Sequence, residues 1–416
     1  MTRAAKKAIL ALLVASITGT IVHAQSRQGD PIRFSLKVGA EYTDNRDSLA
    51  DGEDNTDIWT RPRLDAIVDW DRGALNFYYE PAFRYRTDPN DVQNYTELYH
   101  DIAAVVNHDI NPKLSLNVNE RFAYTDDPAV QRGGTTLRRD SSYLMNWAGL
   151  GAKWKVRPRT VLGVNGTHNL KRYDESEVAI ESDEDRSSAD LSLSHYVAPT
   201  LAFSIVAKAD DVDYEHSDGI DRDYVSSSAG LGVDKILGKT VRGSARAGYM
   251  SLDYDSDDVP SDDSPYFGID VRVEPMPTRR FIAGVTYELR ESYAYPHASQ
   301  EYSGIHGAAE FDLGPHFTLK IGAKYRVGDY DLETVPADAL ARVNSSLDAY
   351  QQWIQHFVVD GKTSGEEKAI VTTLEAAYKI DKNTSLALTH RYEDVDSDVR
   401  VTFDRNAVGL VLTRNF

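Results

Sequence analysis

Apolar and polar residues alternate one by one along much of this chain. From Ile32 to Thr43 the even positions are apolar, and the odd positions are charged, hydroxyl-bearing or glycine. Successive side chains of a β-strand point to opposite faces, so this period of two predicts a strand with one face in an apolar medium. The same alternation from Ile58 to Trp70 and from Ala74 to Thr87 predicts the second and third strands.

Short and long connections between these segments take turns. The short ones carry proline or glycine, as in Asn111-Pro112-Lys113 and Arg157-Pro158-Arg159, and proline presets φ for a turn. The long ones, such as Asp44 to Asp54, are acidic. The alternation predicts about 18 strands, near 31–43, 57–70, 74–87, 94–107, 114–126, 141–154, 160–173, 187–197, 200–214, 223–234, 240–254, 265–274, 279–293, 300–313, 317–329, 367–380, 384–395 and 400–416.

An even number of strands with alternating short and long loops is typical of a bacterial outer-membrane barrel. The last strand carries Val408, Leu410 and Leu412 on one face and stops on Phe416, as a closing strand does. We therefore expect an all-β, up-and-down antiparallel transmembrane barrel over residues 25–416. Four polar residues have lipid-facing parity and predict either a rim position or a register-shifting bulge: His100, Glu120, Asn146 and His195.

Two segments depart from this pattern. Arg3, Lys6 and Lys7 precede a short apolar run that ends near Ala24, which predicts a signal peptide over residues 1–24, cleaved near Ala24. In an insertion at residues 335–366, positions 336–360 have helical spacing and predict a helix over or inside the barrel mouth. The gating or plug candidates on this helix are Leu340, Val343, Leu347, Tyr350, Trp353 and Phe357.

Composition narrows the possible functions. The chain has no cysteine, which excludes disulfides and thiol chemistry. Its net charge of −19 argues against a nucleic-acid partner, because phosphate binding needs a basic surface. The 24 tyrosines suit the aromatic girdles at the two membrane interfaces.

The inward parity gives a set of candidate pore-lining residues. The basic candidates are Arg33, Lys37, Arg61, Arg63, Arg84, Arg86, Arg121, Arg242, Arg246, Lys320, Lys324 and Arg326. Carboxylates share the same wall, so the bases form either a paired lattice that stiffens the lumen or an anion-selective track. The aromatic candidates, which either pack structurally or form a slide for sugar rings, are Tyr78, Tyr99, Tyr143 and Trp147.

Other chemistry has weaker support. The acidic run from Asp253 to Asp258 lacks the spacing of a calcium loop and predicts a solvated loop, loosely bridged to lipopolysaccharide by divalent cations. There is no nucleophile elbow, nucleotide-binding loop or metal-ligand spacing, so we expect no enzyme, no cofactor and no metal site. A hydrolase assembled from Asp, Ser and His on different strands near the rim stays open as an alternative.

Several short motifs resemble the β-barrel porin family of type 2. They are Glu41-Tyr-Thr-Asp-Asn-Arg46 after the first strand, the recurring proline turns, and the terminal Asn415-Phe416. Members are often associated with exopolysaccharide synthesis and secretion, so the resemblance implies an outer-membrane channel that passes exopolysaccharide or related anionic or saccharide solutes. Implied partners are outer-membrane lipid and lipopolysaccharide, a polysaccharide and periplasmic export components. A general diffusion porin and a plugged structural or adhesive barrel are the alternatives.

Overall fold

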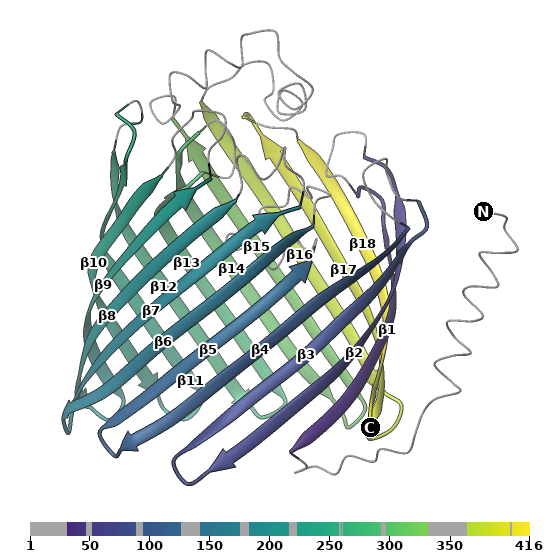
Figure 1. Ribbon diagram of the computed structural model, residues 1–416, viewed down its shortest axis with the longest axis horizontal. Helices are drawn as coiled ribbons and strands as arrows, with labels where there is room; N and C mark the ends of the chain where they lie inside the picture. Colours follow the sequence, from purple (N-terminus) through teal and green to yellow (C-terminus); the bar gives the residue numbers. More distant parts are fainter. Residues whose placement is uncertain are drawn as a thin grey trace, which may run out of the picture.

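A computed structural model describes residues 31–46, 52–88, 95–125, 142–174, 183–215, 223–257, 259, 261–292, 297–331, 364–399 and 402–416. Within these ranges one 18-stranded antiparallel sheet closes into a barrel, because β1 pairs with both β2 and β18 (Figure 1). The strands are β1 (Ile32–Thr43), β2 (Asn55–Trp70), β3 (Gly73–Arg86), β4 (Thr96–Asn111), β5 (Leu114–Thr125), β6 (Tyr143–Arg157), β7 (Thr160–Tyr173), β8 (Glu184–Ala198), β9 (Leu201–Tyr214), β10 (Tyr224–Leu237), β11 (Val241–Tyr254), β12 (Asp262–Met276), β13 (Arg279–Glu291), β14 (Ser299–Leu313), β15 (Phe317–Tyr330), β16 (Gly365–Lys379), β17 (Thr384–Ser397) and β18 (Phe403–Asn415).

These strands confirm the predicted fold and strand order. The strand ends differ from the expected ones by a few residues, as in β4, which continues to Asn111. The expected signal peptide and the expected helix at 336–360, with its six plug candidates, lie outside the described residues. Among the residues that are described, no helix is long and apolar enough to cross a membrane.

One ion pair identifies the inner face of the wall. Arg186 Nη2 on β8 lies 2.9 Å from Glu291 Oε2 on β13, and these strands are not neighbours in the sheet. Such a contact crosses the interior, so Arg186 points into the lumen. The ladder registers carry this parity to the other strands, and the opposite parity holds exposed apolar side chains such as Ile205 and Leu231. An apolar outer surface is what a lipid bilayer requires.

The polar residues of lipid-facing parity stay on the outer face. The ladders from β4 to β8 shift register only near the short turns, at Asp109, Lys155 and Tyr196, so a bulge at His100, Glu120 or Asn146 was the wrong alternative. These residues pair with outer neighbours instead: Asn146 donates to Glu120 Oε1 at 2.5 Å, and Tyr79 Oη lies 2.9 Å from His100 Nδ1. His195 lies at the rim, 3.0 Å from Thr160 Oγ1.

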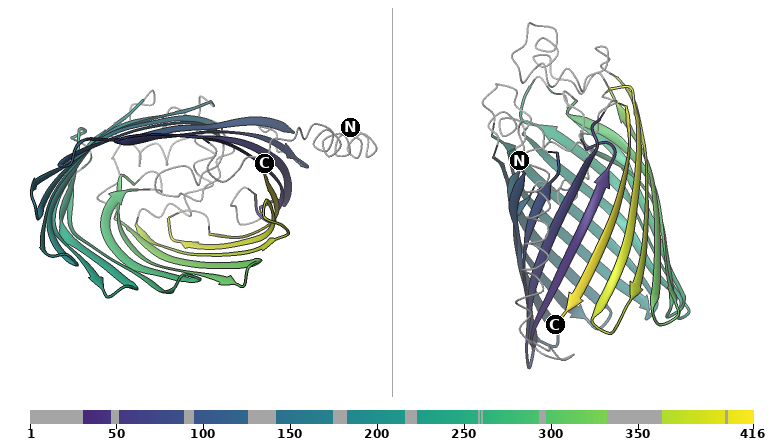
Figure 2. Two further views of the ribbon diagram at one scale, coloured as in Figure 1. Left: turned by 90° about the horizontal axis from the view of Figure 1, so that it is seen from below. Right: turned by 90° about the vertical axis from the view of Figure 1, so that its right-hand side faces the viewer.

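The cross-section of the barrel is a flattened oval (Figure 2, left). At the closing seam, Phe416 N donates to Phe34 O at 2.9 Å, and the two rings lie 5.3 Å apart on the side of the short turns. At the opposite end Asn406 Nδ2 donates to Asp44 Oδ2 at 2.9 Å. Both ends of the seam between β1 and β18 are therefore fixed by contacts outside the ladder.

Candidate functional site in the barrel lumen

The inner face of β1–β3 carries a lattice of ion pairs. Glu80 lies 3.3 Å from Lys37 Nζ and 3.6 Å from Arg63 Nη1, and Arg63 also donates to Asp65 Oδ1 at 2.9 Å. Higher on the same wall Arg84 lies 3.7 Å from Asp57. Charged groups that share a confined polar space pair in this way because pairing offsets the loss of hydration.

The lattice continues onto β4 and β5. Arg121 Nε and Nη2 donate to the two oxygens of Asp101 at 3.0 and 2.9 Å, and Tyr78 Oη donates to Asp101 Oδ1 at 3.0 Å. The Arg63 guanidinium lies 4.0 Å from the centre of the Tyr78 ring. Arg86 pairs with Glu97. Of the predicted bases on this wall, those named here are held by carboxylates, which favours the structural lattice at these positions over a free anion track.

A second region departs from the regular cylinder. The β12–β13 ladder ends at Phe267–Tyr287, while β13 and β14 stay paired up to Glu291–Ser299. Beyond Tyr287 the end of β13 turns into the lumen, where its ribbon lies inside the ring of the other strands (Figure 2, left). Leu289 is 1% exposed and packs in one cluster with Val212, Tyr214, Tyr224 and Leu252 on the inner face of β9–β11. We call this inward end of β13, residues 287–291, the crossing segment.

Charge pairing fixes the tip of the crossing segment. Glu291 accepts hydrogen bonds from Arg186 Nη2 at 2.9 Å and from Tyr224 Oη at 3.1 Å. Arg186 Nε also donates to Glu184 at 2.7 Å, and Glu184 accepts from Lys171 Nζ at 2.9 Å. Two acids and two bases thus form a chain from β7 to β13 on the inner face of the barrel.

Two ionisable side chains lie just outside the strands, at the end of the barrel where the long connections are. Asp183 precedes β8 and accepts a hydrogen bond from Tyr173 N at 2.6 Å, and burial raises the pKa of its carboxyl. His297 precedes β14, and its Nδ1 lies 3.1 Å from Asp331 O. Burial lowers the pKa of His297, so its imidazole is neutral at pH 7.

The opposite wall pairs its bases as well. Arg246 lies 3.2 Å from Asp234, Lys320 lies 2.9 Å from Glu375, and Arg326 lies 3.6 Å from Glu367. Lys324 Nζ lies 5.8 Å from the centre of the Tyr302 ring. Fully buried Glu393 accepts from Arg405 at 2.6 Å, a pair that the sequence patterns did not single out.

Three predicted bases have a different environment. Arg33 and Arg242 point inward near the short turns, and within the described residues neither takes part in an ion pair. The Arg61 guanidinium lies 4.6 Å from the centre of the Trp59 ring.

The four aromatic candidates differ in what covers them. Tyr78 lies against Arg63, Tyr99 is 4% exposed, and Tyr143 is 1% exposed with its ring 5.4 Å from that of Tyr173. Trp147 remains partly exposed on the inner face of β6. The structure thus brings the first three into packed clusters and leaves Trp147 facing the lumen.

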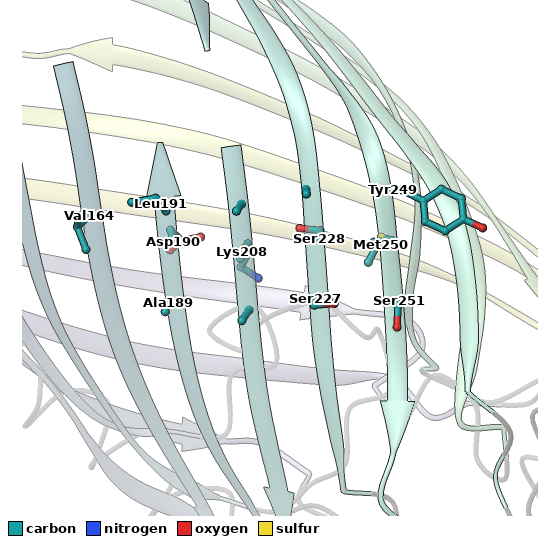
Figure 3. Close-up of a pocket in the computed structure, with 13 residues that line it drawn as sticks. Val164, Ala189, Asp190, Leu191, Lys208, Ser227, Ser228, Tyr249, Met250 and Ser251 are labelled. Atoms are coloured by element: carbon teal, nitrogen blue, oxygen red, sulfur yellow. The ribbon is translucent and has the colours of Figure 1, made fainter. Parts of the chain in front are cut away.

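A groove of about 580 Å³ lies on the outside of the wall rather than in the lumen (Figure 3). Its floor is made of small residues of lipid-facing parity on β8–β10, and Leu191 and Tyr249 form its sides. The floor residues are Ala189, Ala207, Ala209, Ser227 and Ala229. Because this surface faces lipid, the groove is not part of a conduction path.

Comparison with known proteins gives a family and distant structural likenesses. Residues 31–416 match the family described as "Putative beta-barrel porin 2". Similar solved structures from Pseudomonas aeruginosa include OpdL (13% identity, 93% of this chain and 98% of that chain, TM-score 0.47) and OccK5, or OpdH (13%, 92% and 98%, 0.49). OprD from the same organism has 11% identity over 93% and 94%, with a TM-score of 0.47. A search of curated proteins finds no match.

Proposed function

The chain belongs to the family described as putative beta-barrel porin 2, and from this premise we propose that it is an outer-membrane channel that passes an exopolysaccharide, or related anionic or saccharide solutes, out of the cell. The observation that carries the proposal is the closed 18-stranded wall of the described residues with charged and amide side chains on its inside. A barrel of this strand number is wide enough for an aqueous path.

The character of the inner wall supports a hydrophilic cargo. Most of its bases are paired with carboxylates. The wall therefore offers hydrogen-bonding groups and compensated charges rather than a strong electric field of one sign. Such a wall suits a hydroxyl-rich polymer, because each sugar unit exchanges hydrogen bonds with water for hydrogen bonds with the wall at little net cost. Periplasmic export components would deliver the polymer at the end where the short turns lie.

The crossing segment favours one alternative, a barrel that is closed at rest. Glu291 and Leu289 occupy space that the regular cylinder would leave open. A general diffusion porin is the other alternative in the same class. The export channel, the closed barrel and the diffusion porin differ in conductance and in their response to the polymer.

The deciding experiment combines planar-bilayer recording with an export assay. We expect purified protein to give ohmic single-channel steps, with a reversal potential in a salt gradient that reports charge selectivity. Deleting the gene should abolish surface polymer, and restoring it should recover the polymer. Conductance with normal export after deletion would favour the diffusion porin, and absence of any conductance would favour the closed barrel.

A further inference from the structure

Trp147 is a partly exposed aromatic residue on the inner face of β6. It lies on β6 opposite Arg121 of β5 and Asn169 of β7. Among the described residues Trp147 has no ring pair and no cation stacked over its ring, whereas the Arg61 guanidinium lies over the Trp59 ring. A partly exposed indole in a wet lumen presents a flat apolar surface that water solvates poorly.

A row of amides leads to this indole. On the inner face of β4 and β5, Asn117 Nδ2 donates to Asn107 Oδ1 at 2.8 Å, and Asn119 Nδ2 donates to Asn117 Oδ1 at 2.9 Å. Asn119 is paired with Gly149, two residues from Trp147 on the same face of β6. Each of the two amide nitrogens uses one of its two hydrogens in this row and has a second one to donate to a ligand, whereas Asn119 Oδ1 is buried against Gly149.

Glycines keep the floor beside the indole flat. A Cβ at position 149 would collide with the Asn119 amide, and one at position 151 would approach Asn165 Oδ1. The amide of Asn119 therefore lies across the neighbouring strand instead of standing up from the wall. The result is a shallow shelf with hydrogen-bonding edges and one aromatic ring at its end.

The shelf continues along the ladder toward Arg186. Ladder pairs join Arg121 to Trp147, Trp147 to Asn169, and Asn169 to Arg186. Arg186 holds the tip of the crossing segment through Glu291. The row of ladder partners therefore runs from the indole to the residue that holds the crossing segment.

We propose that Trp147 and the Asn117–Asn119 amides form a saccharide subsite for an uncharged hexose unit of a linear polymer. The C–H face of a pyranose ring stacks on the indole, and its hydroxyl groups bond to the two amides. An uncharged unit fits because the Arg121 guanidinium beside the indole is already held by both oxygens of Asp101. The inference rests on the proposed channel and deepens it by naming the unit recognised.

The test measures sugar block of single-channel current in planar bilayers, with maltohexaose as the probe. We expect concentration-dependent closures in the wild type and at least a tenfold higher half-blocking concentration in Trp147→Ala. Trp59→Phe is the matched control: it alters a lumenal tryptophan already in contact with Arg61, and its block should equal that of the wild type. Asn119→Ala, a smaller change, should raise the half-blocking concentration about threefold with unchanged conductance in the absence of sugar.

The outcomes separate this inference from the proposed function. Absence of any wild-type conductance would overturn the channel itself. Normal conductance without maltohexaose block, or equal block in Trp147→Ala and wild type, would overturn the subsite and leave the channel standing. If Trp147→Ala does not assemble, Asn119→Ala and Trp147→Phe decide: block identical to wild type in both would overturn the subsite.

Discussion

The walls at β1–β5 and at β8–β13 solve the same problem, charge inside a membrane protein, in different ways. In the first, partners lie on the same or a nearby strand, as in Arg63 with Asp65 and Arg121 with Asp101. In the second, Arg186 on β8 meets an acid 105 residues away, at the end of β13 that packs on the inner face of β9–β11. The first arrangement stiffens a cylinder without changing its bore, whereas the second requires a strand to leave the cylinder and narrows it.

The largest expected effect comes from Arg186→Ala. The change leaves Glu184 and Glu291 without their shared base, so the crossing segment should move away from the wall at β8–β11. We expect the free energy of unfolding, measured by urea titration in detergent micelles, to fall by about 3 kcal/mol. Single-channel conductance in planar bilayers should rise at the same time.

Arg172→Ala is the control for this change. Arg172 lies on β7, has lipid-facing parity and pairs with Asp185 at 2.7 Å. Its loss should leave conductance unchanged. Equal conductance of Arg186→Ala and wild type would show that the crossing segment does not limit the bore.

Leu289→Ala should have the next largest effect. Its side chain is 1% exposed in the cluster with Val212 and Tyr224, so truncation removes apolar contacts and leaves a cavity. The expected loss is about 2–3 kcal/mol in the same unfolding assay. Leu231→Ala, at an outer position that is 67% exposed, is the matched control and should cost under about 1 kcal/mol. Similar losses in both variants would contradict the assigned packing.

Glu80→Gln tests the ion-pair lattice on the wall at β1–β5. Lys37 and Arg63 would lose their common carboxylate, which adds uncompensated positive charge to the lumen. We expect a shift of the reversal potential toward anions in a tenfold KCl gradient, with a stability change of about 1 kcal/mol. An unchanged reversal potential would mean that this lattice lies outside the field felt by the permeating ions.

The smallest expected effect is that of Asp65→Asn. Arg63 keeps Glu80 as a partner after this change, and both members of the Arg63–Asp65 pair are about one-third exposed. Unfolding free energy should change by no more than about 0.5 kcal/mol. A loss as large as that of Arg186→Ala would remove the distinction between the two regions.

Sequence patterns predicted the wall at β1–β5 well but did not predict the crossing segment. The alternation of charged and apolar residues gave the inward position of Arg63 and Arg121, and the carboxylates on the same wall suggested pairing as one of two alternatives. Through Val285 and Tyr287 the same alternation gives Leu289 an outward parity, yet Leu289 is buried in the lumen. Nothing in the period of β13 signals the bend, because the bend follows from contacts with distant strands.

The aromatic candidates also show that parity along a strand does not reveal which side chains are covered by neighbours. Inward parity is shared by Tyr78, Tyr143 and Trp147, so sequence could not rank them as binding surfaces. Tyr78 lies against Arg63 and Tyr143 against Tyr173, and only the arrangement of neighbouring strands reveals this. Asn117 and Asn119 have no signature in the sequence, because amides in a strand carry no motif.

Alternation along the sequence was enough to predict the number of strands, their order and the face of most side chains in the regular ladders, because it is a local property of extended backbone. Three features could be found only in the folded barrel: β13 leaves its ladder, Arg186 meets Glu291, and Trp147 remains partly exposed in the lumen. These features depend on contacts between segments far apart in the chain. Their energies are set by burial and charge pairing in the closed barrel, which no local period encodes.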